Sequence, residues 1–421
     1  MICFYLSLLF YILFIVSHSQ PSLDFQLIEV QNETSKCFDG SNSSYYFRNC
    51  SANWDSHSGF DYCANITDTW VIHFSSDSLT PTNGSALGGA LCYSDESCSN
   101  RNQELKSSLG LNSTAFLQGI VIPYAEVNPN LYKQHSVVIP YCSSDLWIGR
   151  EEPFLGSNIV TSTILQLFNH SYIPQGMGPT MAHADRIIII GGAGIMAQLD
   201  EINDLIISTL QYVTGNESAT VPVFGICDGC LLVNITPSFI PPQCTTDKNC
   251  PPQLAIEYLS NYRSIYRPKN CHEIKTSSCY LAQSVANSLL TGDTPVLVQS
   301  QLYDQVQLLS YGINTSLNAS KSEQTWAIEN YAPTIRSLLQ HFNYSFSAAC
   351  AMPSYLTLSR GYYQLTTRFQ DIYGNVHSDA LDVALSSFLE DASIGGFGPS
   401  VFGSYKDICN EWLCGTCSFI S

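Results

Sequence analysis

Residues 185–200, DRIIIIGGAGIMAQLD, have a layout that presents a nucleophile, yet they contain no serine, threonine or cysteine. The four isoleucines at 187–190 predict a buried parallel strand, since β-branched residues suit a sheet covered on both faces. Gly191, Gly192 and Gly194 permit a sharp turn. Apolar residues then recur at helical spacing and predict a helix over 194–212. A strand, a glycine turn and a helix form a nucleophile elbow, in which a serine normally occupies the turn.

A second stretch that could carry chemistry contains Cys227 and Cys230, which are separated by two residues. This spacing suits a redox-active pair or one half of a zinc site. No second C-x-x-C and no H-x-x-x-H motif follows in this stretch to complete a zinc site. Two more cysteines, Cys244 and Cys250, lie nearby and are available for disulfides. We therefore expect structural disulfides here, with no metal and no cofactor.

The first 19 residues indicate secretion. They contain no Asp, Glu, Lys or Arg, and their apolar run at 3–16 ends before small residues, which predicts a signal peptide cleaved after Ser19. A signal anchor is the alternative, although the run is short for a membrane span. The chain has 17 cysteines, and removal of Cys3 leaves 16, an even number that suits disulfides in an oxidising compartment.

Two sets of residues follow from this expectation. Disulfides are expected to include Cys92, Cys98, Cys142, Cys227, Cys230, Cys244, Cys250, Cys271, Cys279, Cys350, Cys409, Cys414 and Cys417. Twelve N-x-Ser/Thr sequons predict glycans at Asn32, Asn42, Asn49, Asn65, Asn83, Asn112, Asn169, Asn216, Asn234, Asn314, Asn318 and Asn343.

The remaining composition limits the partners. A formal charge of -18 disfavours nucleic acid and anionic membranes. No second apolar run is long enough to span a membrane, and the final residues, CGTCSFIS, are neither a lipid-anchor signal nor an ER-retention signal. The mature chain is expected to be extracellular, without an integral membrane span.

Short apolar runs separated by helical patterns predict an α/β fold with a mainly parallel central sheet and helices on both faces. The expected strands are 69–74, 136–142, 187–190, 221–227 and 294–303. Residues 20–65 are rich in Ser, Asn and Cys and predict a disulfide-tied N-terminal excursion. No repeat or linker interrupts the chain, so residues 20–421 are expected to form one domain after the signal peptide at 1–19.

Several motifs, in the same order along the chain, resemble those of the pectin acetylesterase and Notum family of secreted carboxylesterases. The segment VVIPYCSSDLWIG at 137–149 is very close to the family's I-P-Y-C-S-S-D-x-W-x-G, and VFGICDGCLLV at 223–233 is similar to V-x-G-x-x-D-S-G-x-F-L. Residues 88–101 are similar to the family's oxyanion region, and the cysteines at 409–417 to its C-terminal cluster. The resemblance covers residues 69–417 and implies an α/β-hydrolase fold with disulfide-rich insertions.

The resemblance also implies a catalytic triad that this chain does not complete. When the aspartate after the family elbow G-x-S-A-G-G is set on Asp200, Ile189 takes the place of the nucleophile and Ile190 that of the next oxyanion-hole donor. The segment VLVQSQLYDQVQL resembles the one with the catalytic acid and places Asp304 there. Pro353 takes the place of the histidine in F-A-P-A-C-x-x-H and cannot accept a proton.

Gly89 and Ala90 correspond to the family's other oxyanion-hole positions, and their backbone N–H groups can still bind an anion. An inserted segment at 75–87 separates them from the preceding strand. His377 is the late histidine that could replace the missing base. Without a histidine, Asp304 is expected to be a hydrogen-bonded relic of the triad.

Three other polar residues near these motifs are expected to be structural. Ser143 and Asp145 have short polar side chains that close loops at strand ends. His183 precedes the isoleucine strand and is expected on a surface loop.

Two classes of function remain. The first is an inactive homologue that binds an acylated protein, an acetylated glycan or extracellular matrix proteins, or that is purely structural. The second is an active carboxylic ester hydrolase with a displaced nucleophile, which deacetylates a polysaccharide or removes lipid from a protein.

Overall fold

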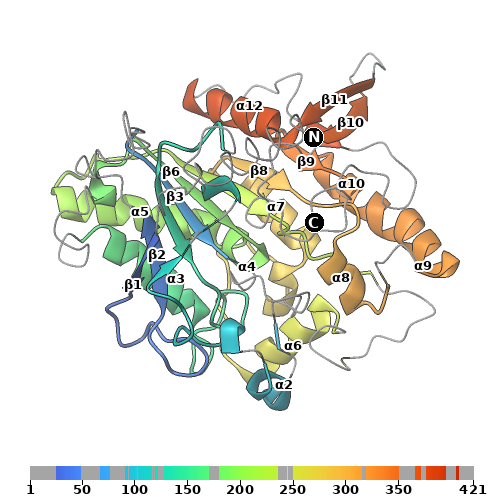
Figure 1. Cartoon of the computed structure of the whole chain (residues 1–421), viewed down its shortest axis with the longest axis horizontal. Helices are drawn as coiled ribbons and strands as arrows, with labels where there is room; N and C mark the ends of the chain where they lie inside the picture. The colour runs from blue at the N-terminus through green and yellow to red at the C-terminus, as the bar shows by residue number, and fades with distance from the viewer. Residues whose placement is uncertain are drawn as a thin grey trace, which may run out of the picture.

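One large sheet with helices on both of its faces dominates the computed structural model of the chain (Figure 1). The described residues are 25–48, 67–75, 91–92, 94–101, 103–115, 117, 119–121, 128–169, 180–235, 244, 250–314, 319–349, 366–370, 376–394 and 404–406. The expected signal peptide lies outside them.

The large sheet has ten described strands in the order β12-β9-β8-β7-β6-β3-β5-β2-β1-β4. Their bounds are β1 Phe25–Glu29, β2 Ser44–Arg48, β3 Thr69–Phe74, β4 Thr114–Ala115, β5 His135–Ile139, β6 Arg186–Gly191, β7 Val223–Asp228, β8 Val296–Gln299, β9 Ser345–Ser347 and β12 Ser404–Lys406. Neighbours from β12 to β5 are parallel, whereas β2, β1 and β4 extend the sheet antiparallel. The expected mainly parallel sheet is confirmed. Strands β10 (Thr366–Gln370) and β11 (Val376–Ala380) form a separate antiparallel pair.

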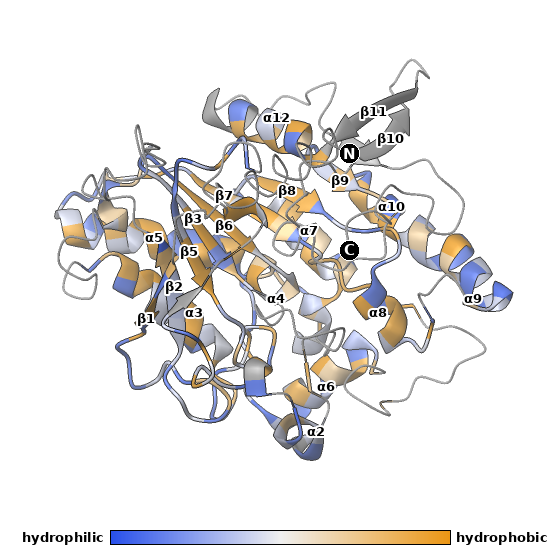
Figure 2. Cartoon of the chain, viewed as in Figure 1, coloured by the Kyte–Doolittle hydropathy of each residue, from blue (hydrophilic) through white to orange (hydrophobic). Residues whose placement is uncertain are grey.

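The sheet separates two hydrophobic clusters, one on each of its faces, and the helices cover them. The helices are α2 Asp95–Ser99, α3 Gly156–Leu167, α4 Ala193–Met196, α5 Leu199–Thr214, α6 Pro252–Tyr262, α7 Ala282–Thr291, α8 Gln305–Ser310, α9 Lys321–Trp326, α10 Ala332–Leu339 and α12 Leu381–Ile394. Residues of α3, α5, α6, α7 and α10 pack in the larger cluster, and those of α12 in the other. Figure 2 shows the hydrophobic colour on the central strands and the hydrophilic colour at the outer end of α9.

Strand β6 lies in the middle of the sheet, between β3 and β7. Ile187 and Ile189 belong to the larger cluster, and Ile188 and Ile190 to the other. None of the four side chains is exposed. The isoleucine run is therefore the central, doubly covered strand that the sequence predicts.

The helix expected over 194–212 is wrong in one respect, because it is divided into α4 and α5. The side chain of Gln198 donates from Nε2 to the carbonyl oxygens of Gly194 (2.6 Å) and Trp147 (3.2 Å). The backbone N–H of Gln198 bonds to the Ile195 carbonyl, which tightens the chain here. Helix α5 then continues to Thr214.

Three further expectations need correction, two of them at the ends of strands. Strand β5 stops at Ile139, because Pro140 has no N–H for the ladder. Strand β8 ends at Gln299, and the chain then turns toward α8. Residues 25–48 do not form a separate excursion, because they supply β1 and β2 to the large sheet. The expected disulfide tie is present, since Cys37 is bonded to Cys142, which follows β5.

Five disulfides join the described cysteines: Cys37–Cys142, Cys92–Cys98, Cys227–Cys230, Cys244–Cys250 and Cys271–Cys279. The pairing of Cys227 with Cys230 agrees with the expected structural disulfide. Among the described residues no group of three His, Cys, Asp or Glu side chains is placed to bind a metal. Those residues also include no helix long and apolar enough to cross a membrane. Cys350, Cys409, Cys414 and Cys417 lie outside them.

Thiol counting checks how far this pairing extends. We expect the protein, denatured without reductant, to expose fewer than four free thiols, since every described cysteine is paired. Reduction should then destabilise it, because a native disulfide in a secreted domain contributes about 2 to 5 kcal/mol. Four or more free thiols would contradict the expectation.

Two buried histidines predict a loss of stability in acid. Burial lowers the pKa of His73 to about 3 and that of His135 to about 4. Unfolding restores a pKa near 6.5, so the unfolded chain binds more protons as the pH falls below about 7. Each histidine should therefore remove about 2 kcal/mol of unfolding free energy between pH 7 and pH 5.

Urea unfolding at the two pH values tests this expectation. His73→Leu should reduce the loss by about 2 kcal/mol. His183→Gln, at an exposed position, should leave the loss unchanged. Equal pH dependence of the two variants would show that His73 does not titrate on unfolding.

Candidate active site

The elbow turn lies between β6 and α4, and a glycine occupies it. Strand β6 ends at Gly191, and α4 begins at Ala193. Gly192 between them is the N-cap of α4, with φ −83° and ψ −163°. The residue at the turn therefore presents no side chain to a substrate.

Ile189 lies within the strand and not at this turn. It pairs with Ile72 of β3 and Gly225 of β7, and its side chain is fully buried. Ile190 pairs with His73 of β3 and is equally buried. The two positions assigned from sequence to the nucleophile and to the next oxyanion-hole donor are thus core positions of the sheet. The structure places the turn three residues further along the chain, at Gly192.

The other glycines of the elbow are required by packing. A Cβ atom on Gly194 would lie 1.8 Å from the carbonyl oxygen of Leu146, and one on Gly191 would lie 2.7 Å from Cβ of Ile195. Both distances are far below van der Waals contact. The first turn of α4 therefore packs directly against the loop that contains Leu146.

That loop follows β5 and has an unusual backbone. Ser144, Leu146 and Trp147 have φ values of 59°, 60° and 68°, which non-glycine residues seldom adopt. Trp147 also donates a hydrogen bond from its indole to the carbonyl oxygen of Ser75 (3.0 Å). Such strain persists only where surrounding contacts fix the chain.

Asp145 supplies those contacts. Its Oδ1 accepts hydrogen bonds from Ser143 Oγ (2.5 Å) and Trp147 N (2.9 Å), and its Oδ2 accepts from Gly149 N (3.0 Å) and Gly156 N (2.8 Å). Burial raises the pKa of Asp145 to about 6, and these donors oppose that rise. Ser143 and Asp145 are structural groups, as expected.

Asp304 stands at the start of α8, beyond the end of β8. Its Oδ1 accepts from the backbone N–H groups of Val306 (2.9 Å) and Gln307 (3.1 Å), and its Oδ2 accepts from Nε2 of Gln307 (3.0 Å). Burial raises its pKa, and these hydrogen bonds lower it. Within the described part of the chain, no histidine donates a hydrogen bond to this carboxyl group. Asp304 acts as a helix cap here.

The sequence of this chain matches one known protein family over most of its length. A family sequence model described as Pectinacetylesterase matches residues 16–367, well over half of the chain. The chain belongs to the pectinacetylesterase family.

Relatives of this pectinacetylesterase-family chain include palmitoleoyl-protein carboxylesterases. It is 25% identical over 353 residues to notum2 of Xenopus laevis, covering 80% of this chain and 63% of the relative. It is 25% identical over 353 residues to NOTUM of Mus musculus, covering 79% of this chain and 61% of the relative. The chain thus spans about three fifths of the length of these relatives.

The pectinacetylesterase-family fold is also found in a solved structure. A crystal structure of the Wnt deacylase Notum from Drosophila superposes with a TM-score of 0.69 and 20% identity, covering 93% of this chain and 99% of that one. This likeness confirms the α/β-hydrolase fold.

Several family positions fall outside the described residues of this pectinacetylesterase-family chain. They are the oxyanion-hole positions Gly89 and Ala90 and the position of the base, Pro353. His377 lies in β11, where its backbone pairs with Phe369. His183 is exposed at the end of a short helical turn, as expected.

The described sequons lie at the surface of this pectinacetylesterase-family protein. Seven of their asparagines are exposed, namely Asn32, Asn112, Asn169, Asn216, Asn234, Asn314 and Asn343, and Asn42 is partly exposed. Asn49, Asn65, Asn83 and Asn318 lie outside the described residues. The exposed positions are accessible to glycosylation, which stays a prediction.

Proposed function

We propose that this protein is a secreted, glycosylated member of the pectinacetylesterase family that binds its ligand without hydrolysing it. The observation that carries the proposal is the composition of the elbow. Residues 186–200 contain no serine, threonine or cysteine, and the turn itself is Gly192. Covalent acyl transfer by the family route needs a nucleophile at this turn.

The turn geometry favours a new register for the family motif. When the serine of S-A-G-G is set at the turn, Gly192, Ala193 and Gly194 take the places of its serine, alanine and first glycine. This register lies three residues beyond the one that uses Ile189. It makes Ala193 the oxyanion-hole donor in place of Ile190. In either register the nucleophile is missing, so the proposal does not depend on the choice.

The ligand that we propose is an acylated extracellular protein. The support comes from the relatives, which are named as palmitoleoyl-protein carboxylesterases. The nucleophile is needed to hydrolyse an acyl ester but not to bind the acyl chain, so a protein of this fold can bind such a ligand without it. An acetylated glycan and matrix proteins are the other ligands to test. A negatively charged nucleic acid is disfavoured by the charge of -18.

The alternative function is hydrolysis with a nucleophile from another part of the chain. We expect the purified protein to show no efficient turnover of p-nitrophenyl acetate or octanoate and no labelling by a fluorophosphonate serine probe. A hydrolysis rate roughly 10³-fold above the uncatalysed rate in water does not contradict this expectation, since oxyanion-hole donors and substrate binding alone can supply that much. An active Notum relative serves as the positive control.

Binding is measured on the same preparation, with a palmitoleoylated peptide and the same peptide without the acyl group. Preferential binding of the acylated peptide without release of fatty acid supports the proposal. Efficient turnover that is abolished by mutation of one particular serine would refute it and would establish the hydrolase.

A further inference from the structure

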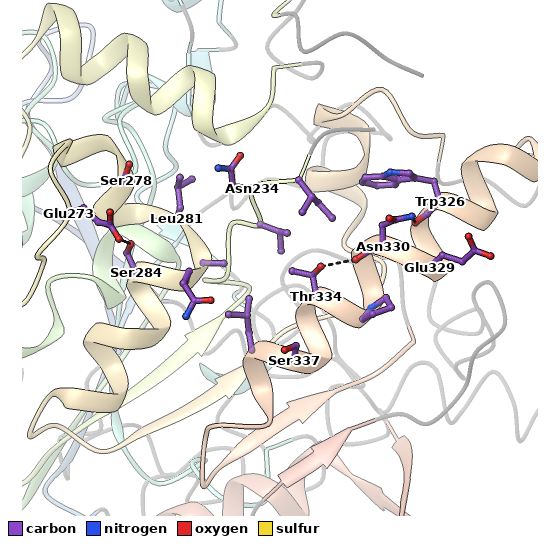
Figure 3. Close-up of a pocket in the computed structure, with 16 residues that line it drawn as sticks. Asn234, Glu273, Ser278, Leu281, Ser284, Trp326, Glu329, Asn330, Thr334 and Ser337 are labelled. Atoms are coloured by element: carbon purple, nitrogen blue, oxygen red, sulfur yellow. Dashed lines mark hydrogen bonds between the residues drawn. The ribbon is translucent and has the colours of Figure 1, made fainter. Parts of the chain in front are cut away.

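A groove of about 890 Å³ lies between the start of α7 and the helices α9 and α10 (Figure 3). Gln283 and Ser284 of α7 line one side. Trp326 at the end of α9 and Thr334 of α10 line the other. The volume is within the range of sites that bind small organic ligands, about 300–1,000 Å³.

Asn234 lines the same groove and is one of the predicted glycosylation sites. It is exposed, has no regular secondary structure and begins the sequon N-I-T at 234–236. Figure 3 shows Asn234 between Leu281 on one side and Trp326 on the other. A glycan on this asparagine would start inside the groove.

The groove has the chemistry of a neutral sugar site. Trp326 lines the groove but is only 8% exposed, so an edge of its indole, and not a ring face, is available to a sugar. Glu273 and Glu329 line the groove as hydrogen-bond acceptors, and none of the described residues that line it is a lysine or an arginine. A polyuronate or another anionic glycan would meet two carboxylates here, with no compensating positive charge. N-acetylglucosamine and mannose, which are neutral, would not.

We propose that the groove binds the inner, neutral sugars of the protein's own N-linked glycan at Asn234. A sugar bound with a dissociation constant in the millimolar range gains about 4 kcal/mol of binding free energy. That is too little for a free sugar at low concentration to occupy the groove. A covalently tethered sugar has an effective concentration in the millimolar range or above. Tethering at Asn234 therefore makes weak contacts sufficient. The glycan closes the groove to diffusible ligands.

The test compares Asn234 with Asn216, which is also exposed but lies at the turn after α5, away from this groove. Glycopeptide mass spectrometry of the secreted protein should show Asn234 occupied. An amidase that removes N-glycans should release the Asn234 glycan from the native protein at least ten-fold more slowly than the Asn216 glycan. After denaturation the two rates should agree.

Changes to the groove should remove this protection. Trp326→Ala should accelerate release at Asn234 and leave Asn216 unchanged. If Trp326→Ala is not secreted, the double variant Glu329→Ala and Asn330→Ala changes two exposed side chains and should have the same effect. An unoccupied Asn234, equal native release rates at the two sites, or protection that survives the groove variants would each overturn the proposal.

Discussion

Replacement of Asp145 with alanine is expected to cost about 4 kcal/mol of unfolding free energy and to stop secretion of folded protein. The carboxylate accepts four hydrogen bonds from Ser143, Trp147, Gly149 and Gly156. Alanine would leave these buried donors without an acceptor, and each unsatisfied group costs about 1–3 kcal/mol. The strained backbone of the loop would lose its support at the same time.

Urea unfolding and secretion yield measure this loss. Asp204→Ala is the matched control, because Asp204 forms an exposed ion pair with Lys269, and such pairs contribute about 0–1 kcal/mol. Asp145→Asn should lie between the two, since an amide keeps one acceptor and turns its NH₂ toward a donor. A loss below about 1 kcal/mol for Asp145→Ala would show that the network does not support the loop.

The second large effect concerns the recovery of hydrolysis. Gly192→Ser should give a folded and inactive protein, because a serine hydroxyl needs a base and Pro353 cannot act as one. Ile189→Ser should also be inactive. It should in addition lose about 2–4 kcal/mol, since it removes a buried isoleucine from the central strand and buries a hydroxyl there.

The double variant Gly192→Ser and Pro353→His supplies both missing groups. We expect weak turnover of an activated ester, with a burst of p-nitrophenol from an acyl-enzyme. The double variant Ile189→Ser and Pro353→His is the matched control and should show no burst. A burst from Ile189→Ser alone would contradict the register that places the turn at Gly192, and His377→Ala in that background would then test His377 as the base.

The central parallel strands could be predicted from the sequence because their signals are local, whereas β1, β2, β4, β9 and β12 were not predicted. Residues 187–190 are all β-branched, and 69–74 match β3 to the residue. The ends of elements were less predictable. The break between α4 and α5 depends on the bond from Gln198 to the carbonyl of Trp147, a residue 51 positions earlier. No periodicity in the helix itself contains that information.

The residues assigned to the site stay predictions, and the structure differs from the sequence-based assignment in the register of the turn. The absence of serine from the elbow is a property of the sequence alone. The position of the turn depends on where α4 can begin, and that is set by the contact between Gly194 and Leu146. The cap role of Asp304 likewise depends on α8, which starts at the next residue.

The contact between Gly194 and the Leu146 carbonyl also bears on how such a protein can change over time. The sharp turn after β6 is held by close packing, which persists whether or not a reaction takes place there. The turn therefore does not depend on which residue occupies it. A substitution at Gly192 would place a new side chain on a turn that packing has already formed.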